Sequence, residues 1–222
     1  MEPADRNHRP EPILTTKLYI PQPPSGSVRR ERLLRRLEEG LAPVGHRRAH
    51  QLALISAPAG YGKTTLLAHW IAQTRLPVAW LSLDEGDNDV ARFLVYLTAA
   101  LNRLPGFSLS AEAEGRAPSP DTLLTSVLNQ AAELPVPVVL VLDDLHRIEA
   151  PAVYELIAYL LEHQPPTLRL IIATRADPPL PIPRLRAADQ LTEIRQGGLR
   201  FTPEEAADFL REVMSLDIDE EQ

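Results

Sequence analysis

Hydrophobic and polar positions along the chain form short apolar runs that alternate with segments of helical periodicity. Apolar runs predict strands at 52–56, 78–83, 138–142 and 168–174, and 191–194 is predicted to be a short final strand. Apolar residues spaced three to four apart predict helices at about 29–40, 63–75, 90–103, 121–133, 151–163 and 203–214. Strands that alternate with helices in this way indicate an α/β fold, with a parallel sheet flanked by helices on both faces.

The segments between these elements are rich in proline and polar residues. Residues 1–27 are predicted to be an extended, Pro-rich lead-in with a short extended piece at 16–20. Residues 105–120 are predicted to be a mobile loop, and the PPLPIP stretch at 178–183 a rigid one. Asp121 and Thr202 are the expected N-caps of the two helices that follow them.

The first strand runs into a loop of small residues and then directly into a helix. Small residues allow successive backbone N–H groups to turn inward around phosphate oxygens, and the helix N-terminus adds unpaired donors. A Lys at the helix start can reach the β- and γ-phosphates, and the Thr hydroxyl after it can hold Mg²⁺. The expected nucleotide-binding residues are Ala59, Gly60, Tyr61, Gly62, Lys63, Thr64 and Thr65.

One position departs from the usual pattern of such a phosphate-binding loop. The pattern has a Gly five residues before Gly62, where this chain has Ala57. Alanine tolerates the extended backbone expected at a strand end, so we interpret it as a tolerated variant. The alternative is an ordinary turn that happens to precede a Lys. Of the 23 Lys and Arg residues only Lys17 and Lys63 are Lys, which favours a selected point charge at Lys63.

Polar residues follow two other predicted strands. Asp143 and Asp144 come after the aliphatic run at 138–142, and Thr174 and Arg175 end the run at 168–174. Because ligands of open parallel sheets bind at the carboxyl ends of the strands, these groups should meet the phosphate loop.

Asp143 is the expected Mg²⁺ residue together with Thr64, and Asp144 is placed to orient or deprotonate the attacking water. Arg175 is expected to stabilise phosphoryl charge and to sense the γ-phosphate. The alternatives are that the two carboxylates merely cap a turn and that Arg175 forms a surface salt bridge. We assign no chemistry to His146 and expect Trp70 and Trp80 in the core.

Composition restricts the class of protein further. The chain of 222 residues is 44% hydrophobic and contains no Cys, which fits one large globular domain without disulfides or thiolate metal sites. No 18-residue apolar run and no signal-peptide core are present, so a cytoplasmic location is expected. The net charge is −7, and the basic cluster within 29–36 is interpreted as a solvated helix face rather than a nucleic-acid footprint.

Several long segments together resemble one protein family. They are APAGYGKTTLL, VVLVLDDLH, IIATRADPPLPIPRLRA, LRFTPEEA and, near the N-terminus, TKLYIPQPP and VRRERLLRRL. Over about residues 15–212 the chain resembles the N-terminal ATPase module of MalT-like, LuxR-type transcriptional activators, which belong to the STAND class of P-loop NTPases. The resemblance implies a five-stranded sheet in the order 5-1-4-3-2, binding of ATP or ADP with Mg²⁺, and slow hydrolysis. By position, Arg30 matches the family Arg that lies near the nucleotide.

The resemblance also implies how the chain is divided into segments and which functions lie outside it. Residues 1–27 form the lead-in, 28–200 a P-loop NTPase domain of the NB-ARC or AAA type, and 201–222 the start of a following helical subdomain with an acidic tail. The leading hypothesis is a nucleotide switch whose sensor and DNA-binding domains lie outside this chain, so that the chain itself binds nucleotide but neither DNA nor membrane. Nucleotide-dependent self-association is expected as well. A stand-alone AAA-type turnover ATPase is the main alternative, and a P-loop kinase a weaker one.

Overall fold

The computed structural model describes residues 13–42, 49–110 and 118–213. Its centre is one sheet of five parallel strands in the order β2-β3-β4-β1-β5. The strands are β1 (Leu52–Ser56), β2 (Val78–Ser82), β3 (Val138–Asp143), β4 (Leu168–Thr174) and β5 (Leu191–Arg195). This is the expected order 5-1-4-3-2 counted from the other edge, so the predicted fold class is confirmed.

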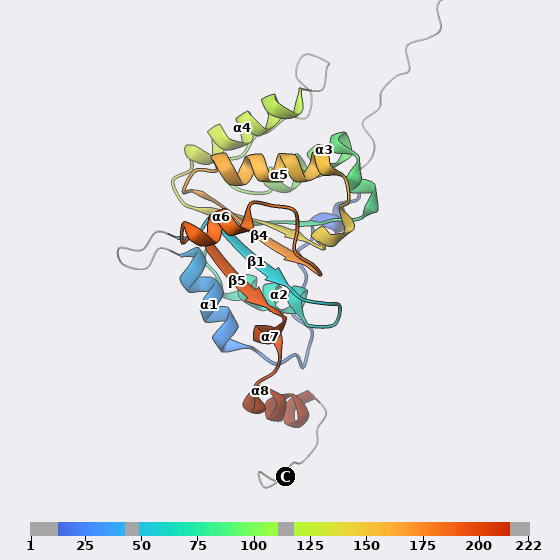
Figure 1. Ribbon diagram of the computed structural model, residues 1–222, viewed down its shortest axis with the longest axis vertical. Helices are drawn as coiled ribbons and strands as arrows, with labels where there is room; N and C mark the ends of the chain where they lie inside the picture. Colours follow the sequence, from blue (N-terminus) through green and yellow to red (C-terminus); the bar gives the residue numbers. More distant parts are fainter. Residues whose placement is uncertain (1–12, 43–48, 111–117, 214–222) are drawn as a thin grey trace, which may run out of the picture.

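Helices connect successive strands and cover the sheet (Figure 1). They are α1 (Glu31–Leu41), α2 (Lys63–Gln73), α3 (Val90–Leu101), α4 (Pro120–Ala132), α5 (Pro151–His163), α6 (Ile182–Ala187), α7 (Gln196–Leu199) and α8 (Pro203–Asp208). Short turns of 3-10 helix occur at Thr15–Leu18 (η1), Glu85–Asn88 (η2) and Leu145–Arg147 (η3), and Phe209–Val213 (η4) continues α8 as π-helix.

Alternate strand residues point to two separate cores, one on each face of the sheet. Leu54, Leu140 and Ile172 pack with α3, α4 and α5, whereas Ile55 and Val141 face the opposite core with α1 and α2. Figure 1 shows the two helical layers on either side of the sheet. Because all five residues are fully buried, the central strands have the unbroken apolar character of a covered parallel sheet.

Both tryptophans are core residues, as predicted. Trp70 and Trp80 are 0% and 1% exposed. Each indole N–H still has an acceptor, the Glu38 carboxylate at 3.0 Å and the Ser82 hydroxyl at 2.8 Å respectively. Burial of these large rings therefore leaves no indole donor unpaired.

Three local predictions were wrong. The piece at 16–20 is not extended throughout, because Thr15–Leu18 forms a 3-10 turn. The N-cap of α4 is Ser119, which accepts a hydrogen bond from the Thr122 N–H at 3.3 Å, because Pro120 starts the helix one residue earlier than expected. The stretch at 178–183 is not entirely loop, since α6 begins at Ile182. Parts of the predicted loop at 105–120 and of the acidic tail lie outside the described residues.

The lead-in segment is anchored to α3 and the turn before it. Lys17 is 6% exposed and forms ion pairs with Asp84, at 3.0 Å, and with the fully buried Asp87. The Leu14 N–H donates to the Tyr96 hydroxyl at 3.0 Å. Lys17 thus has a structural role, and removing it would leave the buried Asp87 carboxylate with Arg92 alone, at 3.6 Å. Within the described ranges, no helix is long and apolar enough to cross a membrane.

Candidate nucleotide-binding site

The loop after β1 has the backbone that phosphate binding requires. Gly60 and Gly62 have positive φ angles of 82° and 72°, which residues with a Cβ adopt at a cost. A Cβ at either position would meet no atom within 4 Å, so the backbone conformation, and not crowding, is what calls for Gly. Gly62 also begins α2 without any side-chain cap, which leaves the first N–H groups of the helix available to an anion.

Lys63 holds this loop in shape. Its ammonium donates to the carbonyl oxygens of Ala57, at 2.7 Å, and Pro58, at 3.0 Å, and the residue is 8% exposed. Burial lowers the pKa of Lys63, and the carboxylates of Asp143 and Asp144 oppose that shift. Ala57 therefore contributes its carbonyl to the loop, and it lacks the positive φ that would demand Gly at this position.

The two residues expected to hold Mg²⁺ are in contact. The Thr64 hydroxyl donates to Asp143 Oδ2 at 2.9 Å, across the gap between α2 and the end of β3. Burial, followed by the neighbouring charge of Asp144, raises the pKa of Asp143 from 3.8 to about 6. The surroundings of Asp143 thus disfavour its ionised form, and a cation bound beside the carboxylate would favour that form again.

Asp144 and Arg175 face the same end of the sheet from two neighbouring strands. Asp144 has a left-handed backbone with φ of 58°, and its side chain is 46% exposed and caps no helix. Arg175 follows β4, which pairs with β1 through Thr174 and Ser56, and it is exposed. Among the described residues no hydrogen bond or ion pair holds its guanidinium, and its charge acts on the pKa of Lys63. The surface salt bridge considered for Arg175 is therefore not found within the described ranges.

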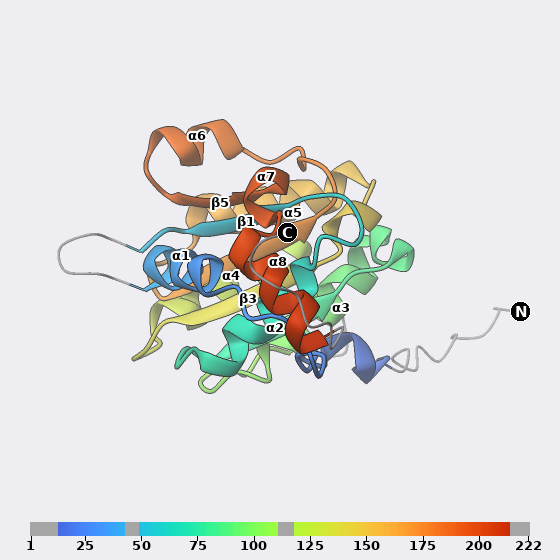
Figure 2. The same ribbon diagram turned by 90° about the horizontal axis from the view of Figure 1, so that it is seen from below.

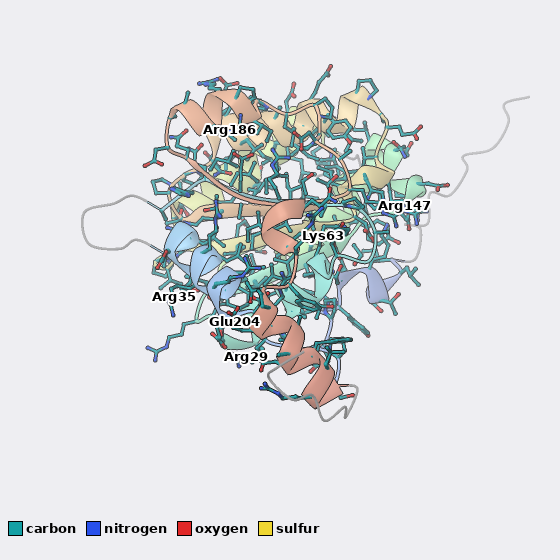
Figure 3. The ribbon with its side chains drawn as sticks, turned by 60° about the horizontal axis from the view of Figure 1, so that its bottom comes forward. Arg29, Arg35, Lys63, Arg147, Arg186 and Glu204 are labelled. Atoms are coloured by element: carbon teal, nitrogen blue, oxygen red, sulfur yellow. The ribbon has the colours of Figure 1, made fainter. Side chains whose placement is uncertain are left out.

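A cavity of about 430 Å³ opens beside the loop. The predicted residues that line it are Ala59, Gly60, Tyr61, Gly62, Thr65 and Arg30. Lys63 and Thr64 lie next to it, on the side of Asp143. The structure thus brings the expected phosphate-binding residues and Arg30 to one place, at the carboxyl end of β1. Figure 3 shows Lys63 in the middle of this face.

The far wall of the cavity comes from residues that sequence reasoning missed. They are Leu199, Arg200, Phe201 and Phe209, from α7, the linker after it and η4. The two Phe rings stack with centroids 5.7 Å apart. Figure 2 shows α7 and α8 in front of the sheet, close to α1 and α2. The available signal was the Phe directly before the capping box of α8, an aromatic residue in an otherwise polar stretch.

Arg30 corrects the interpretation of the basic cluster as a wholly solvated face. It is 7% exposed, its guanidinium donates to the Arg200 carbonyl at 2.9 Å, and it lies 5.0 Å from the centre of the Phe201 ring. It also pairs with Glu205 at 3.4 Å. Arg35 and Arg36 are exposed as predicted.

These features fit a nucleotide with its magnesium ion. The glycine loop and Lys63 offer a place for the phosphates. The pair of Thr64 and Asp143 offers a place for the metal, and the adjoining, mostly apolar cavity a place for the base. In the described ranges no group of three or more His, Cys, Asp and Glu side chains could hold a metal by itself. A hard cation here would therefore depend on phosphate oxygens as well as Thr64 and Asp143.

Comparison with known proteins agrees with the class that this fold and loop define. Residues 27–172 match the family described as the AAA ATPase domain, and the chain belongs to that family. It is accordingly a nucleotide-binding domain. The chain is 39% identical over 201 residues to the HTH-type transcriptional regulator MalT of Cronobacter sakazakii, and 37% identical to that of Klebsiella pneumoniae.

The alignment with MalT covers 89% of this chain and 21% of the Cronobacter protein, so the chain spans about a fifth of the length of these relatives. Among solved structures, Cdc6p from Pyrobaculum aerophilum has a TM-score of 0.53 at 20% identity, covering 80% of this chain and 46% of that one. Aeropyrum pernix Orc1 has a TM-score of 0.50 at 20% identity, covering 87% and 50%. These likenesses concern the fold alone.

Proposed function

We propose that this chain is a nucleotide switch: an ATP- and ADP-binding, slowly hydrolysing module of a bacterial transcriptional activator. The observation that carries the proposal is the composition of the cavity. One wall is the phosphate loop, and the other is the chain segment 199–209 that leaves the domain. A ligand in such a cavity touches both parts, so a change of ligand can change how they sit together.

The protein groups have separable tasks in this proposal. Bound Mg-ATP supplies the phosphoryl group and the metal charge on which hydrolysis depends. Lys63 binds the β- and γ-phosphates, giving up its two carbonyl contacts for stronger charge-assisted ones. Thr64 and Asp143 hold Mg²⁺, and Asp144 orients the attacking water. Arg175, which has no partner of its own among the described residues, binds the γ-phosphate and so distinguishes ATP from ADP.

The segment after β5 is tied to the start of α1 by a set of contacts that we call the clasp, formed by Arg30, Arg32, Arg200 and Glu205. Arg32 donates to Glu205 at 3.0 and 3.2 Å and to the Arg200 carbonyl at 2.7 Å. Arg30 contacts the same carbonyl and the same carboxylate, at 2.9 and 3.4 Å. Because Arg30 also lines the cavity, ligand binding and the clasp share a residue.

The similarity to MalT supports the wider setting. We propose that sensor and DNA-binding functions reside in other domains of a longer cytoplasmic protein, and that this module binds no DNA itself. Residues 1–27, 28–200 and 201–222 are proposed as lead-in, NTPase domain and the start of the next subdomain. Self-association controlled by the nucleotide would link the state of this module to activation of transcription by the longer protein.

A stand-alone turnover ATPase of the AAA type is the alternative. Such enzymes normally have Glu after the metal-binding Asp, and here that residue is Asp144. A shorter side chain places its carboxylate farther from the γ-phosphate, which favours slow hydrolysis.

The test is to identify the nucleotide that co-purifies with the chain and to compare single-turnover with steady-state hydrolysis. A switch retains ADP, so chemistry on the first ATP should be followed by slower ADP release. Rapid, sustained turnover with freely exchanging ADP would favour the motor ATPase instead. Failure to bind either nucleotide would refute both.

A further inference from the structure

The side chain of His146 has an unusual environment for a loop histidine. It lies on η3, the 3-10 turn that directly follows Asp144, and its side chain is 15% exposed. Both ring nitrogens, Nδ1 and Nε2, are buried and lack a hydrogen-bond partner among the described residues. Buried polar atoms nearly always have a partner, so two such atoms on one ring indicate that the partner is a ligand, a water or a side chain that moves.

The charges around the ring determine its protonation state. Burial is the main cause that lowers the pKa of His146, and the cations Arg175, Arg147 and Lys63 act in the same direction, against the carboxylate of Asp144. Arg175 directly follows β4, and Lys63 is the first residue of α2. These causes favour the neutral imidazole, in which one nitrogen is a donor and the other an acceptor.

The Asp144 carboxylate offers an acceptor to one of these nitrogens. The distance from His146 Nδ1 to Asp144 Oδ1 is 3.7 Å, somewhat longer than a hydrogen bond. The Asp144 side chain is 46% exposed, and no hydrogen bond to it is found in the described part of the chain, so it can turn toward the ring. Catalytic hydrogen bonds are often long without substrate and shorten in the complex.

We propose that His146 is a positioning residue for hydrolysis: its ring donates from Nδ1 to Asp144 Oδ1 and fixes the carboxylate that orients the attacking water. This inference rests on the proposed function of Asp144. The left-handed backbone of Asp144, with φ of 58°, determines the direction in which its side chain leaves the main chain. The hydrogen bond from His146 then fixes the carboxylate at the end of that side chain. Nε2, the other ring nitrogen, then remains the acceptor.

The first test uses two amides that imitate different ring nitrogens. His146→Asn places an N–H near the position of Nδ1, and His146→Gln places one near Nε2. Loss of a hydrogen bond to a charged group should slow single-turnover hydrolysis roughly ten- to a hundredfold in His146→Ala and His146→Gln. His146→Asn should recover most of the rate, and the ATP Kd should stay within about twofold in all three.

Arg147→Ala is the control, because Arg147 lies on the same turn but its guanidinium pairs with Glu85, 3.2 Å away, rather than with Asp144. Equal loss in the Asn and Gln variants, or a loss of ATP affinity as large as the loss of rate, would overturn the positioning role.

The second test does not need hydrolysis. Nitrogen-15 NMR of the nucleotide-free chain should show His146 as the Nδ1–H tautomer, and Asp144→Ala should reduce the population of that tautomer. The His146→Asn spectrum assigns the signal among the six histidines. An Nε2–H ring, or one indifferent to Asp144, would refute the pairing. A chain that hydrolyses no ATP but shows the Nδ1–H tautomer would keep the pairing and contradict the proposed hydrolysis.

Discussion

At the scale of single residues, burial disfavours the charged forms of two groups in the candidate site. Burial lowers the pKa of Lys63 and raises the pKa of Asp143 to about 6, so both groups are driven toward their neutral forms. Phosphate oxygens would favour the charged lysine, and a magnesium ion would favour the charged carboxylate. The same burial that disfavours these charges in the free protein strengthens their interaction with a charged ligand.

Lys63 supplies the sharpest residue-scale prediction. Lys63→Ala should weaken ATP binding roughly ten- to a hundredfold, because a charge-assisted hydrogen bond contributes about 1.5–3 kcal/mol. Titration calorimetry measures this change. Arg29→Ala, which removes an exposed cation elsewhere on the same face (Figure 3), should leave the affinity nearly unchanged. Unaltered ATP affinity in a folded Lys63→Ala chain would rule out the phosphate-binding role.

The two adjacent aspartates should separate binding from chemistry. Asp143 contacts Thr64 at 2.9 Å, so Asp143→Asn should abolish the Mg²⁺ dependence of nucleotide binding. Asp144 is half-exposed beside the site, so Asp144→Asn should bind Mg-ATP normally and hydrolyse it more slowly, by about a hundredfold or more. Binding with and without Mg²⁺ and single-turnover rates measure both effects. The reverse behaviour would show that the roles are exchanged.

Arg175 should distinguish the two nucleotides. It follows β4 next to the phosphate loop and has no competing partner in the described part of the chain, and only ATP offers the extra charged oxygens. Arg175→Ala should therefore reduce ATP affinity more than ADP affinity, by roughly tenfold in the ratio. Titrations with ADP and a non-hydrolysable ATP analogue decide the point. An equal loss for both would make Arg175 a general contact.

The site residues that sequence could predict are those whose roles are local. The phosphate loop is continuous in sequence, and Asp143 ends its strand, so topology alone brings Thr64 and Asp143 together. Phe201 could not be predicted in the cavity wall because it lies more than a hundred residues from the loop and joins it only through packing. His146 was dismissed because a lone histidine in a turn has no sequence signal for buried, unpaired nitrogens.

At the scale of elements, apolar runs predicted the four strands β1–β4, because covered parallel strands need apolar residues on both faces. The edge strand β5 is half-buried and was predicted as a short strand without such a run. Helix starts rich in proline were harder to predict. α6 begins within a PPLPIP stretch and carries Pro183 in its first turn, where the missing N–H has no partner to lose. The same physics moved the start of α4 to Pro120, with Ser119 as the cap.

The edge strand β5 gives a prediction about pH. Arg186, at 2.7 Å, and then Arg195 lower the pKa of Glu193 from 4.5 to about 2. The stabilisation is present above pH 4.5 and is lost as the pH falls toward 2. Because these partners are 54% and 35% exposed, we expect about 1–2 kcal/mol rather than the full shift.

Glu193→Gln should therefore destabilise the chain at pH 7, and the difference from the unaltered chain should shrink at pH 3. Urea unfolding at both values measures it, with the exposed Glu155→Gln as control. A difference that grows on acidification would contradict the assignment.

At the scale of the whole molecule, the cavity and the clasp connect α1, the phosphate loop and α8. Segments 27–30 and 199–209 lie far apart in the chain but line one cavity with the loop. Occupation of that cavity should therefore stabilise the contact between α8 and the sheet domain, and amide hydrogen exchange in α8 should slow when ATP or ADP binds.

The clasp determines how strongly nucleotide binding slows amide hydrogen exchange in α8. Arg32 joins α1 to Glu205 and to the Arg200 carbonyl without itself lining the cavity. Its side chain is 39% exposed, so the pair contributes about 0.2–1 kcal/mol, and Arg32→Ala should reduce the nucleotide-induced protection of 203–208 by up to about fivefold. Arg29→Ala, whose guanidinium pairs with Glu31 at 2.9 Å, should leave that protection unchanged. If exchange in α8 is the same with and without nucleotide in the unaltered chain, occupation of the cavity does not control α8, and the proposed switch through this segment is refuted.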